Sequence, residues 1–167
     1  MPKHGQQKMH PAVKWLCIGI VALIPGCAAP PPPPPPTIVM LNFVAAGDIN
    51  PDPSGRSSSI NIRYYQLGAS GAFEKADYFP LHDKEPALLG KDLFDQQDLL
   101  LVPGASKSVT VDGKPGAKIL GIAASFRDID QATWRADVPI PENKTTKFKV
   151  EISKLKISIV PDGGSAP

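Results

Sequence analysis

Alternating apolar and polar residues dominate residues 37–160. Ile60, Ile62 and Tyr64 lie on one face of an extended segment, since successive side chains of a strand point to opposite faces. Tyr65 and Leu67 continue in the opposite phase, which predicts a bulge. The nearly unbroken apolar run at 118–126 predicts a strand at the centre of a sheet. Further strands are predicted at 37–45, 108–111, 135–140, 147–152 and 155–159.

Other patterns interrupt these strands. The phase of alternation slips at Ser153–Lys154, which predicts a bulge or a sharp bend. Residues 73–79 and 85–89 are typical of short helices, with Pro86 suited to a first turn, and 92–98 predicts one more helical turn. About seven strands with turns between them favour a mainly β, two-sheet sandwich with a short helical insertion at 73–98.

The N-terminal segment has a different pattern. Lys3, Lys8 and Lys14 precede or flank the apolar run 15–24, and no acidic residue occurs before Asp48. This pattern predicts an export signal peptide over residues 1–26, because the apolar run is too short for a permanent transmembrane helix. The run ends in Leu-Ile-Pro-Gly-Cys, which resembles a bacterial lipobox and predicts lipid attachment at Cys27. The alternative is an ordinary signal peptide with an incidental cysteine.

Residues 27–36 are interpreted as the lipidated cysteine and a linker. Seven prolines at 30–36 favour polyproline II, a semi-rigid spacer of roughly 20 Å. The alternative interpretation is a ligand for SH3 or WW domains. The folded domain is then expected at 37–160, with a flexible tail at 161–167.

Composition excludes several functions. Removing residues 1–26, with their three lysines, leaves 15 basic and 16 acidic residues and a net charge of −1. This balance argues against nucleic-acid binding. The mature chain would retain one histidine, His82, interpreted as a surface residue, and no motif for a catalytic nucleophile or a phosphate loop. We therefore expect no catalytic residue, no metal, no cofactor and no small-molecule substrate.

The loop after the first predicted strand contains the candidate site. Its candidate residues are Asp48, Ile49, Asn50, Pro51, Asp52, Pro53, Ser54, Gly55 and Arg56. Oxygen-bearing side chains at alternating positions resemble the start of an EF-hand, but Pro53 and Ser59 occupy positions that need Gly and Glu, so calcium is the weaker alternative. A stiff polar loop loses little entropy when a partner docks, which favours recognition.

A second polar cluster lies between Phe126 and Trp134. It contains Arg127, Asp128, Asp130 and Arg135, which are suited to binding an anion or to forming a structural corner. We favour the corner, with buried aromatic rings and arginine–aspartate pairs.

Several segments together resemble the type VI secretion outer-membrane lipoproteins, the TssJ family (also SciN or VasD). They occur in this order: the lipobox at Cys27, Asn50–Pro51–Asp52 with Gly55–Arg56, the strand at 60–67, Phe73 with 76–79, 89–93, Pro103–Gly104, and 120–128 with Trp134–Arg135. The resemblance implies a transthyretin-like β-sandwich without enzymatic activity. It also implies an anchor on the periplasmic face of the outer membrane that binds the periplasmic C-terminal region of TssM, itself associated with TssL. In the family, the loop between the first two strands is implicated in that contact.

Two other binding functions stay open at this point. A pilotin-like lipoprotein would share the anchor and bind a secretin instead. A glycan-binding sandwich would expose aromatic side chains, for which Tyr64, Tyr65 and Tyr78 are candidates.

Overall fold

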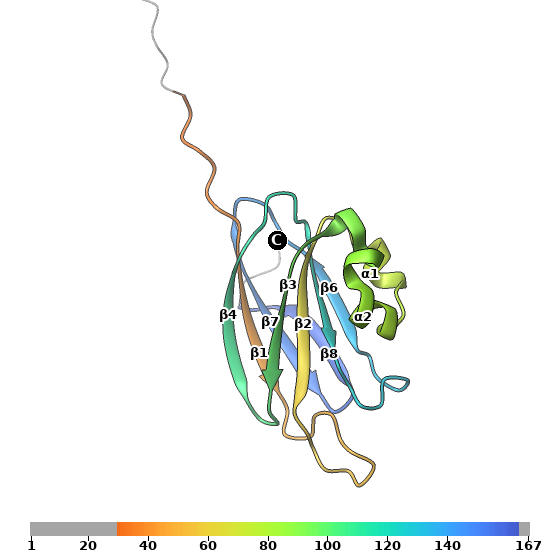
Figure 1. Cartoon of the computed structure of the whole chain (residues 1–167). Helices are drawn as coiled ribbons and strands as arrows, with labels where there is room; N and C mark the ends of the chain where they lie inside the picture. The colour runs from red at the N-terminus through yellow and green to blue at the C-terminus, as the bar shows by residue number, and fades with distance from the viewer. Residues whose placement is uncertain (1–29, 164–167) are drawn as a thin grey trace, which may run out of the picture. The chain divides into compact units, whose positions relative to one another are not determined.

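Two four-stranded sheets face each other in the computed structural model, which describes residues 30–163 (Figure 1). One sheet has the strand order β4-β1-β7-β8 and the other β3-β2-β5-β6. The strands are β1 (Ile38–Ala45), β2 (Ile60–Leu67), β3 (Leu93–Leu101), β4 (Ser106–Asp112), β5 (Ile119–Ala124), β6 (Arg135–Pro139), β7 (Thr145–Ser153) and β8 (Lys156–Pro161). The helices are α1 (Gly71–Lys75), α2 (Tyr78–Leu89) and the short 3-10 helix η1 (Gly90–Asp92).

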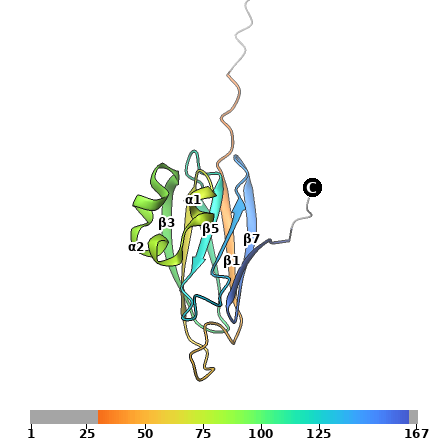
Figure 2. The ribbon, with the colours of Figure 1, turned by 90° about the vertical axis from the view of Figure 1, so that its right-hand side faces the viewer.

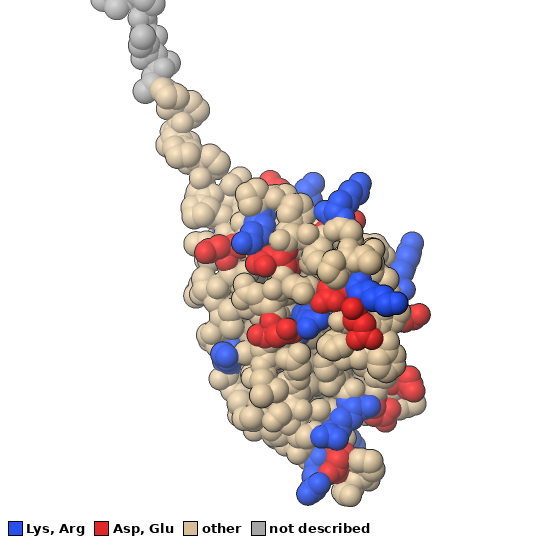
Figure 3. Space-filling view, viewed as in Figure 1, with Lys and Arg blue, Asp and Glu red and all other residues tan. Residues whose placement is uncertain are grey.

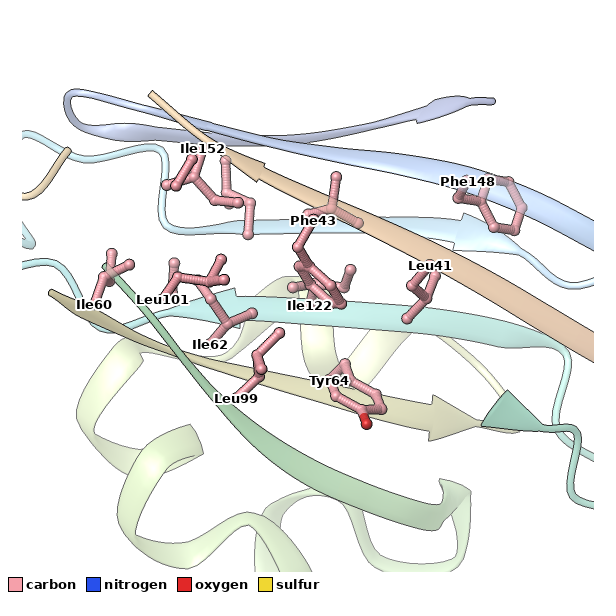
Figure 4. Close-up of a cluster of buried hydrophobic side chains, with 14 of the residues drawn as sticks. Leu41, Phe43, Ile60, Ile62, Tyr64, Leu99, Leu101, Ile122, Phe148 and Ile152 are labelled. Atoms are coloured by element: carbon pink, nitrogen blue, oxygen red, sulfur yellow. The ribbon is translucent and has the colours of Figure 1, made fainter. Parts of the chain in front are cut away.

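The main core lies between the two sheets. Alternate residues of each strand point inward, so Leu41 and Phe43 of β1 face Ile62 of β2 and Ile122 of β5 (Figure 4). Phe43 also lies 6.1 Å from Tyr64, measured between ring centroids. Burying these apolar side chains is the main favourable term in folding. The mainly β, two-sheet sandwich expected from the sequence is confirmed.

A second apolar cluster covers the outer face of β2 and β5. Helices α1 and α2 lie on that face (Figure 2), and Tyr65 and Leu67 of β2 pack there against Phe73 and Leu81. Burial raises the pKa of Tyr65 to about 12. The change of phase at Tyr65 arises because β2 is buried on both faces. The irregularity predicted from Tyr65 and Leu67 is found between Gln66 and Leu67, where the register of β2 with β3 shifts.

The helical turn predicted at 92–98 is wrong, because residues 93–98 belong to strand β3. Two of their polar side chains have partners on the paired strand β2: Gln97 accepts a hydrogen bond from the Tyr64 hydroxyl (2.6 Å) and Asp98 accepts one from Arg63 (2.8 Å). The helical insertion therefore ends at Asp92. The backbone of α2 is non-helical at Lys84, and Pro86 lies in the first turn of the helical stretch that follows.

The remaining sequence patterns are found in the structure. The apolar strand β5 lies inside its sheet, between β2 and β6. The phase slip at Ser153–Lys154 is the sharp bend of the β7–β8 hairpin rather than a bulge. Pro30–Pro36 are exposed and belong to no helix or strand, and β8 ends at Pro161. None of the helices in the described range is long and apolar enough to cross a membrane. The predicted signal peptide and Cys27 lie outside the described residues.

Candidate partner-binding loop

The segment 46–59 joins β1 to β2 and protrudes from one end of the sandwich (Figures 1 and 2). Strand β1 runs the length of its sheet, so the chain begins the sandwich at Ile38 at the opposite end. Seven steps of about 3.3 Å along a strand separate the two ends of β1 by roughly 23 Å.

The base of the loop is buried. Ile49 is fully buried and belongs to the main core. Ile49, one of the candidate binding residues from the sequence, is therefore not available to a partner, because its side chain packs inside its own domain. Ile49 instead fixes the position at which the loop leaves the sandwich.

Asn50 is the polar centre of this base. It is 3% exposed and has a positive φ of 46°. Its side-chain amide donates to the Ser59 carbonyl (2.9 Å), and its side-chain oxygen accepts from the Arg127 backbone N–H (2.8 Å). Its backbone N–H donates to the Lys154 carbonyl (2.9 Å), and its carbonyl accepts from the Ser58 hydroxyl (2.5 Å). Asn50 thus joins three separate segments, and its side chain is not available to a partner.

The tip of the loop is closed by Asp52. One carboxylate oxygen accepts from the backbone N–H groups of Ser54 (2.9 Å) and Arg56 (3.0 Å), and the other accepts from the Arg56 side chain (2.9 Å). Gly55 supplies the left-handed conformation that this turn needs, with a φ of 82°. The tip is therefore held in one shape before any partner arrives.

The hydrogen-bond donors around Asp52 also favour its charged form. The backbone N–H of Arg56, followed by its side chain, lowers the pKa of the Asp52 carboxyl. The Arg56 side chain itself is 83% exposed. The side-chain oxygens of Asp52 accept hydrogen bonds from its own loop, and the side-chain oxygen of Asn50 accepts one from Arg127. Both residues were candidate calcium ligands, and their oxygens already have these partners. Among residues 30–163, no three Asp, Glu, His or Cys side chains come together as a metal site would require.

A groove of about 520 Å³ runs beside the tip. Its walls come from three segments that are distant in sequence. The lining residues are Pro51, Asp52 and Pro53 of the loop, Arg127 and Asp128 after β5, and Lys154 and Leu155 of the β7–β8 turn. Charged side chains of both signs gather at this end of the molecule (Figure 3).

The cluster at 126–135 is a structural corner, as favoured from the sequence, but its hydrogen bonds differ from those expected. Phe126 is buried, and the Arg127 side chain donates to the Ser58 hydroxyl (3.0 Å). Arg135 lies over the Trp134 ring, 4.6 Å from its centroid, and donates to the carbonyls of Phe73 and Ala76. The expected arginine–aspartate pairs are absent among the salt bridges of the described residues, because backbone carbonyls and a hydroxyl take their place.

The histidine and tyrosine candidates are placed as follows. His82 is partly buried, and its ring stacks on that of Tyr78 with 5.6 Å between the ring centroids. Its backbone carbonyl accepts a hydrogen bond from the Arg63 side chain (3.2 Å). Tyr64 and Tyr65 are buried, in the main core and under the helices respectively. Neither of them offers a ring to a glycan.

The sequence pattern indicated the loop but missed two of its properties. It placed Ile49 and Asn50 on the binding surface, although an apolar residue followed by an Asn, a residue type that tolerates positive φ, is a signal for a buried turn. It also missed the contribution of Arg127, Lys154 and Leu155 to the groove. No local pattern marks these three residues, because only the fold brings them to the loop.

Comparison with known proteins places the chain in a family. The family model described as "Type VI secretion lipoprotein, VasD, EvfM, TssJ" matches residues 37–155. The type VI lipoprotein TssJ1 from Pseudomonas aeruginosa is 34% identical, with a TM-score of 0.75 over 80% of this chain and 100% of that one. A chain in the structure described as the type VI protein TssM C-terminal domain from EAEC is 29% identical, with a TM-score of 0.62 over 75% of this chain and 99% of that one.

A third structure supports the fold alone. Lip from Serratia marcescens, described as a membrane-bound component of the type VI secretion system, is 24% identical, with a TM-score of 0.71 over 77% of this chain and 99% of that one. No curated protein sequence matches the chain. The family expected from the sequence motifs is nevertheless confirmed by the family model and the solved structures. The chain therefore belongs to the type VI secretion lipoprotein family (VasD, EvfM, TssJ), a family of non-enzymatic outer-membrane lipoproteins of the secretion system's membrane complex.

Proposed function

We propose that this chain tethers the type VI membrane complex to the outer membrane by binding the periplasmic C-terminal region of TssM through the exposed tip of the 46–59 loop. The observation that carries this proposal is the self-closed tip, in which Asp52 accepts two backbone and further side-chain hydrogen bonds from its own loop. A surface that is already ordered loses little conformational entropy on docking.

The position of the tip supports the same function. A lipid on Cys27 would hold the chain upstream of Ile38, at the end of the sandwich opposite the loop. The tip lies at the other end of the folded domain, so a tether that enters at Ile38 leaves it free for a partner. The family relative found in a structure described as the TssM C-terminal domain supports TssM as the partner.

The contact surface we propose is smaller than the sequence suggested. It comprises Pro51, Asp52, Pro53, Ser54, Gly55 and Arg56, together with the groove formed by Arg127, Lys154 and Leu155. Asp48 is exposed next to this surface, whereas Ile49 and Asn50 act only as its support. Exposed charges such as Arg56 would mainly affect the association rate, and Leu155 in the groove would affect dissociation.

The experiment replaces residues 52–56 with a Gly/Ser segment of equal length and leaves Ile49 and Asn50 intact. Binding of the full chain, extracted in detergent, to the purified periplasmic region of TssM is then measured. We expect the dissociation constant to rise at least tenfold, about 1.4 kcal/mol, because the replaced tip loses both its contacts and its order.

A matched control replaces residues 141–144, a polar loop at the Ile38 end, in the same way. Both variants must melt like the wild type. A tip replacement that binds TssM within twofold of the wild type contradicts the proposal, and so does an equal loss of affinity in both variants.

A further inference from the structure

Strand β3 forms a free edge of its sheet. It pairs with β2 on one side, and the strand order β3-β2-β5-β6 places no strand on its other side. The edge strands β6 and β8 lie close to each other, and Thr133, just before β6, forms a bridge with Lys156 of β8, whereas no such bridge reaches β3 within residues 30–163. An open strand edge offers a row of backbone donors and acceptors to any extended chain.

The hydrogen bonds of β2 show which backbone groups of β3 face outward. Asn61 and Leu67 bond through their carbonyls to the β5 side, to the N–H groups of Ser125 and Lys118. Antiparallel pairing alternates, so the backbone groups of Ile60 and Ile62 bond to β3, opposite Leu101 and Leu99. The N–H and C=O groups of Asp98 and Leu100 therefore point away from the sheet. No hydrogen bond among the described residues reaches these four groups.

The side chains on the same stretch are apolar and exposed. Leu100 is 64% exposed and Val102 is 52% exposed, while Leu99 and Leu101 between them are buried in the core. Figure 3 shows a surface without charged side chains over the lower part of β3, between the charges at its middle and those at the loop end. Two exposed apolar residues at alternate positions favour contact with a strand that carries apolar residues at the same spacing.

This edge is continuous with the proposed TssM-binding surface. Leu101 pairs with Ile60, the first residue after the loop, and Val102 follows directly at the end of β3. The turn after β3 is also tied to the start of the loop, since the Gly104 N–H donates to the Ala46 carbonyl (3.1 Å). A partner seated on the loop tip thus has the open edge of β3 within reach.

We propose that the β3 edge from Asp98 to Val102 accepts an extended strand of the periplasmic region of TssM, which adds a fifth strand to the β3-β2-β5-β6 sheet. This inference rests on the proposed function and adds a second, backbone-directed contact to it. The outward N–H and C=O groups of Asp98 and Leu100 bond to the main chain of the incoming strand, while Leu100 and Val102 pack against its apolar side chains. Main-chain bonding supplies affinity, and the two apolar positions select the register.

Hydrogen exchange tests the backbone contact directly. The full chain, extracted in detergent, is exchanged with and without the purified TssM region, and deuterium uptake is followed by mass spectrometry over the peptide 93–102. We expect slower exchange at the amides of Asp98 and Leu100 in the complex, by tenfold or more, because strand addition protects these two N–H groups. Unchanged exchange in a saturated complex overturns the proposal.

A pair of variants tests the side chains. Leu100→Lys is expected to weaken TssM binding at least tenfold, since it places a charge at the apolar contact. Val160→Lys, at an exposed apolar residue of the other edge strand β8, is expected to change affinity less than twofold. Equal effects of the two variants overturn the proposal, as does protection of β3 that arises from self-association without TssM.

The two proposals fail separately. If replacing 52–56 abolishes binding while Leu100→Lys binds like the wild type, the loop is the site and the added strand is wrong. If neither change affects TssM binding, both proposals are wrong.

Discussion

At the residue scale, Asn50 determines how the binding loop is supported. Each of its four polar groups has a partner, and the partners come from Ser58 and Ser59 in its own loop, from Arg127 and from Lys154. A left-handed backbone costs most residues with a Cβ about 1–2 kcal/mol, and Asn is among the residues that tolerate it best. The residue therefore meets a backbone requirement and a hydrogen-bonding requirement together.

We predict that Asn50→Ala lowers the free energy of unfolding by about 2–4 kcal/mol, because it removes the hydrogen bonds to the Ser59 carbonyl and the Arg127 N–H and strains the backbone. Asn50→Gly removes the same hydrogen bonds and tolerates the positive φ, so its cost should be about 1 kcal/mol smaller. Urea unfolding followed by circular dichroism measures both values. Equal costs for the two variants would show that the positive φ carries no penalty here.

At the element scale, Arg63 attaches the helical insertion to the sheet. Its guanidinium donates to Glu85 of α2 (2.5 Å) and to Asp98 of β3 (2.8 Å), and it reaches the His82 carbonyl. Glu85 is 7% exposed and also accepts from Gln96 (3.1 Å). The hydrogen bond from Arg63 is the main cause that lowers the pKa of Asp98. Helix α2 and strand β3 are thus both bound to the partly buried guanidinium of Arg63.

We predict that Arg63→Met lowers the free energy of unfolding by about 3 kcal/mol, since it leaves the Glu85 carboxylate buried without its partner. In a Glu85→Gln background, the same change should cost at least about 1 kcal/mol less, because no buried charge is then abandoned. Lys149→Met, which breaks the exposed pair with Glu151, should leave unfolding nearly unchanged. Additive effects of Arg63→Met and Glu85→Gln in the double-mutant cycle would contradict the coupling.

At the scale of the whole molecule, we propose that the chain combines an attachment segment with a recognition surface. The sandwich begins at Ile38 at one end, and the loop leaves from the other. The proposed division into a signal peptide at 1–26, a lipidated linker at 27–36 and a folded domain from residue 37 separates export, anchoring and recognition along the chain. Two or more acyl chains suffice for durable membrane anchoring, at about 0.8 kcal/mol per buried methylene.

We predict that a fatty-acid probe supplied to growing bacteria labels the wild-type chain and Cys17→Ser but not Cys27→Ser. The reason is that only Cys27 follows the lipobox-like segment, whereas Cys17 lies within the apolar run that signal cleavage removes. The two cysteines serve as matched controls for each other. Labelling of Cys27→Ser at the wild-type level would refute the anchor.

The sequence by itself determined most of the strands, the sandwich and the family. The alternation of apolar residues at Ile60, Ile62 and Tyr64 is a local property of an extended chain, and so is the apolar run of β5, so both were predictable without contacts. The loop was also predictable as a segment, because its prolines, asparagine and aspartates determine their own turns.

Only the tertiary structure decided the use of the individual residues. Tyr65 is buried because the helices cover its face of β2. Residues 93–98 form a strand because Arg63 and Tyr64 of β2 bind its polar side chains. Ile49 belongs to the core and not to the binding surface because side chains from distant segments surround it. Burial and pairing arise from segments far apart in the chain, and a pattern along the sequence contains no information on which segments meet.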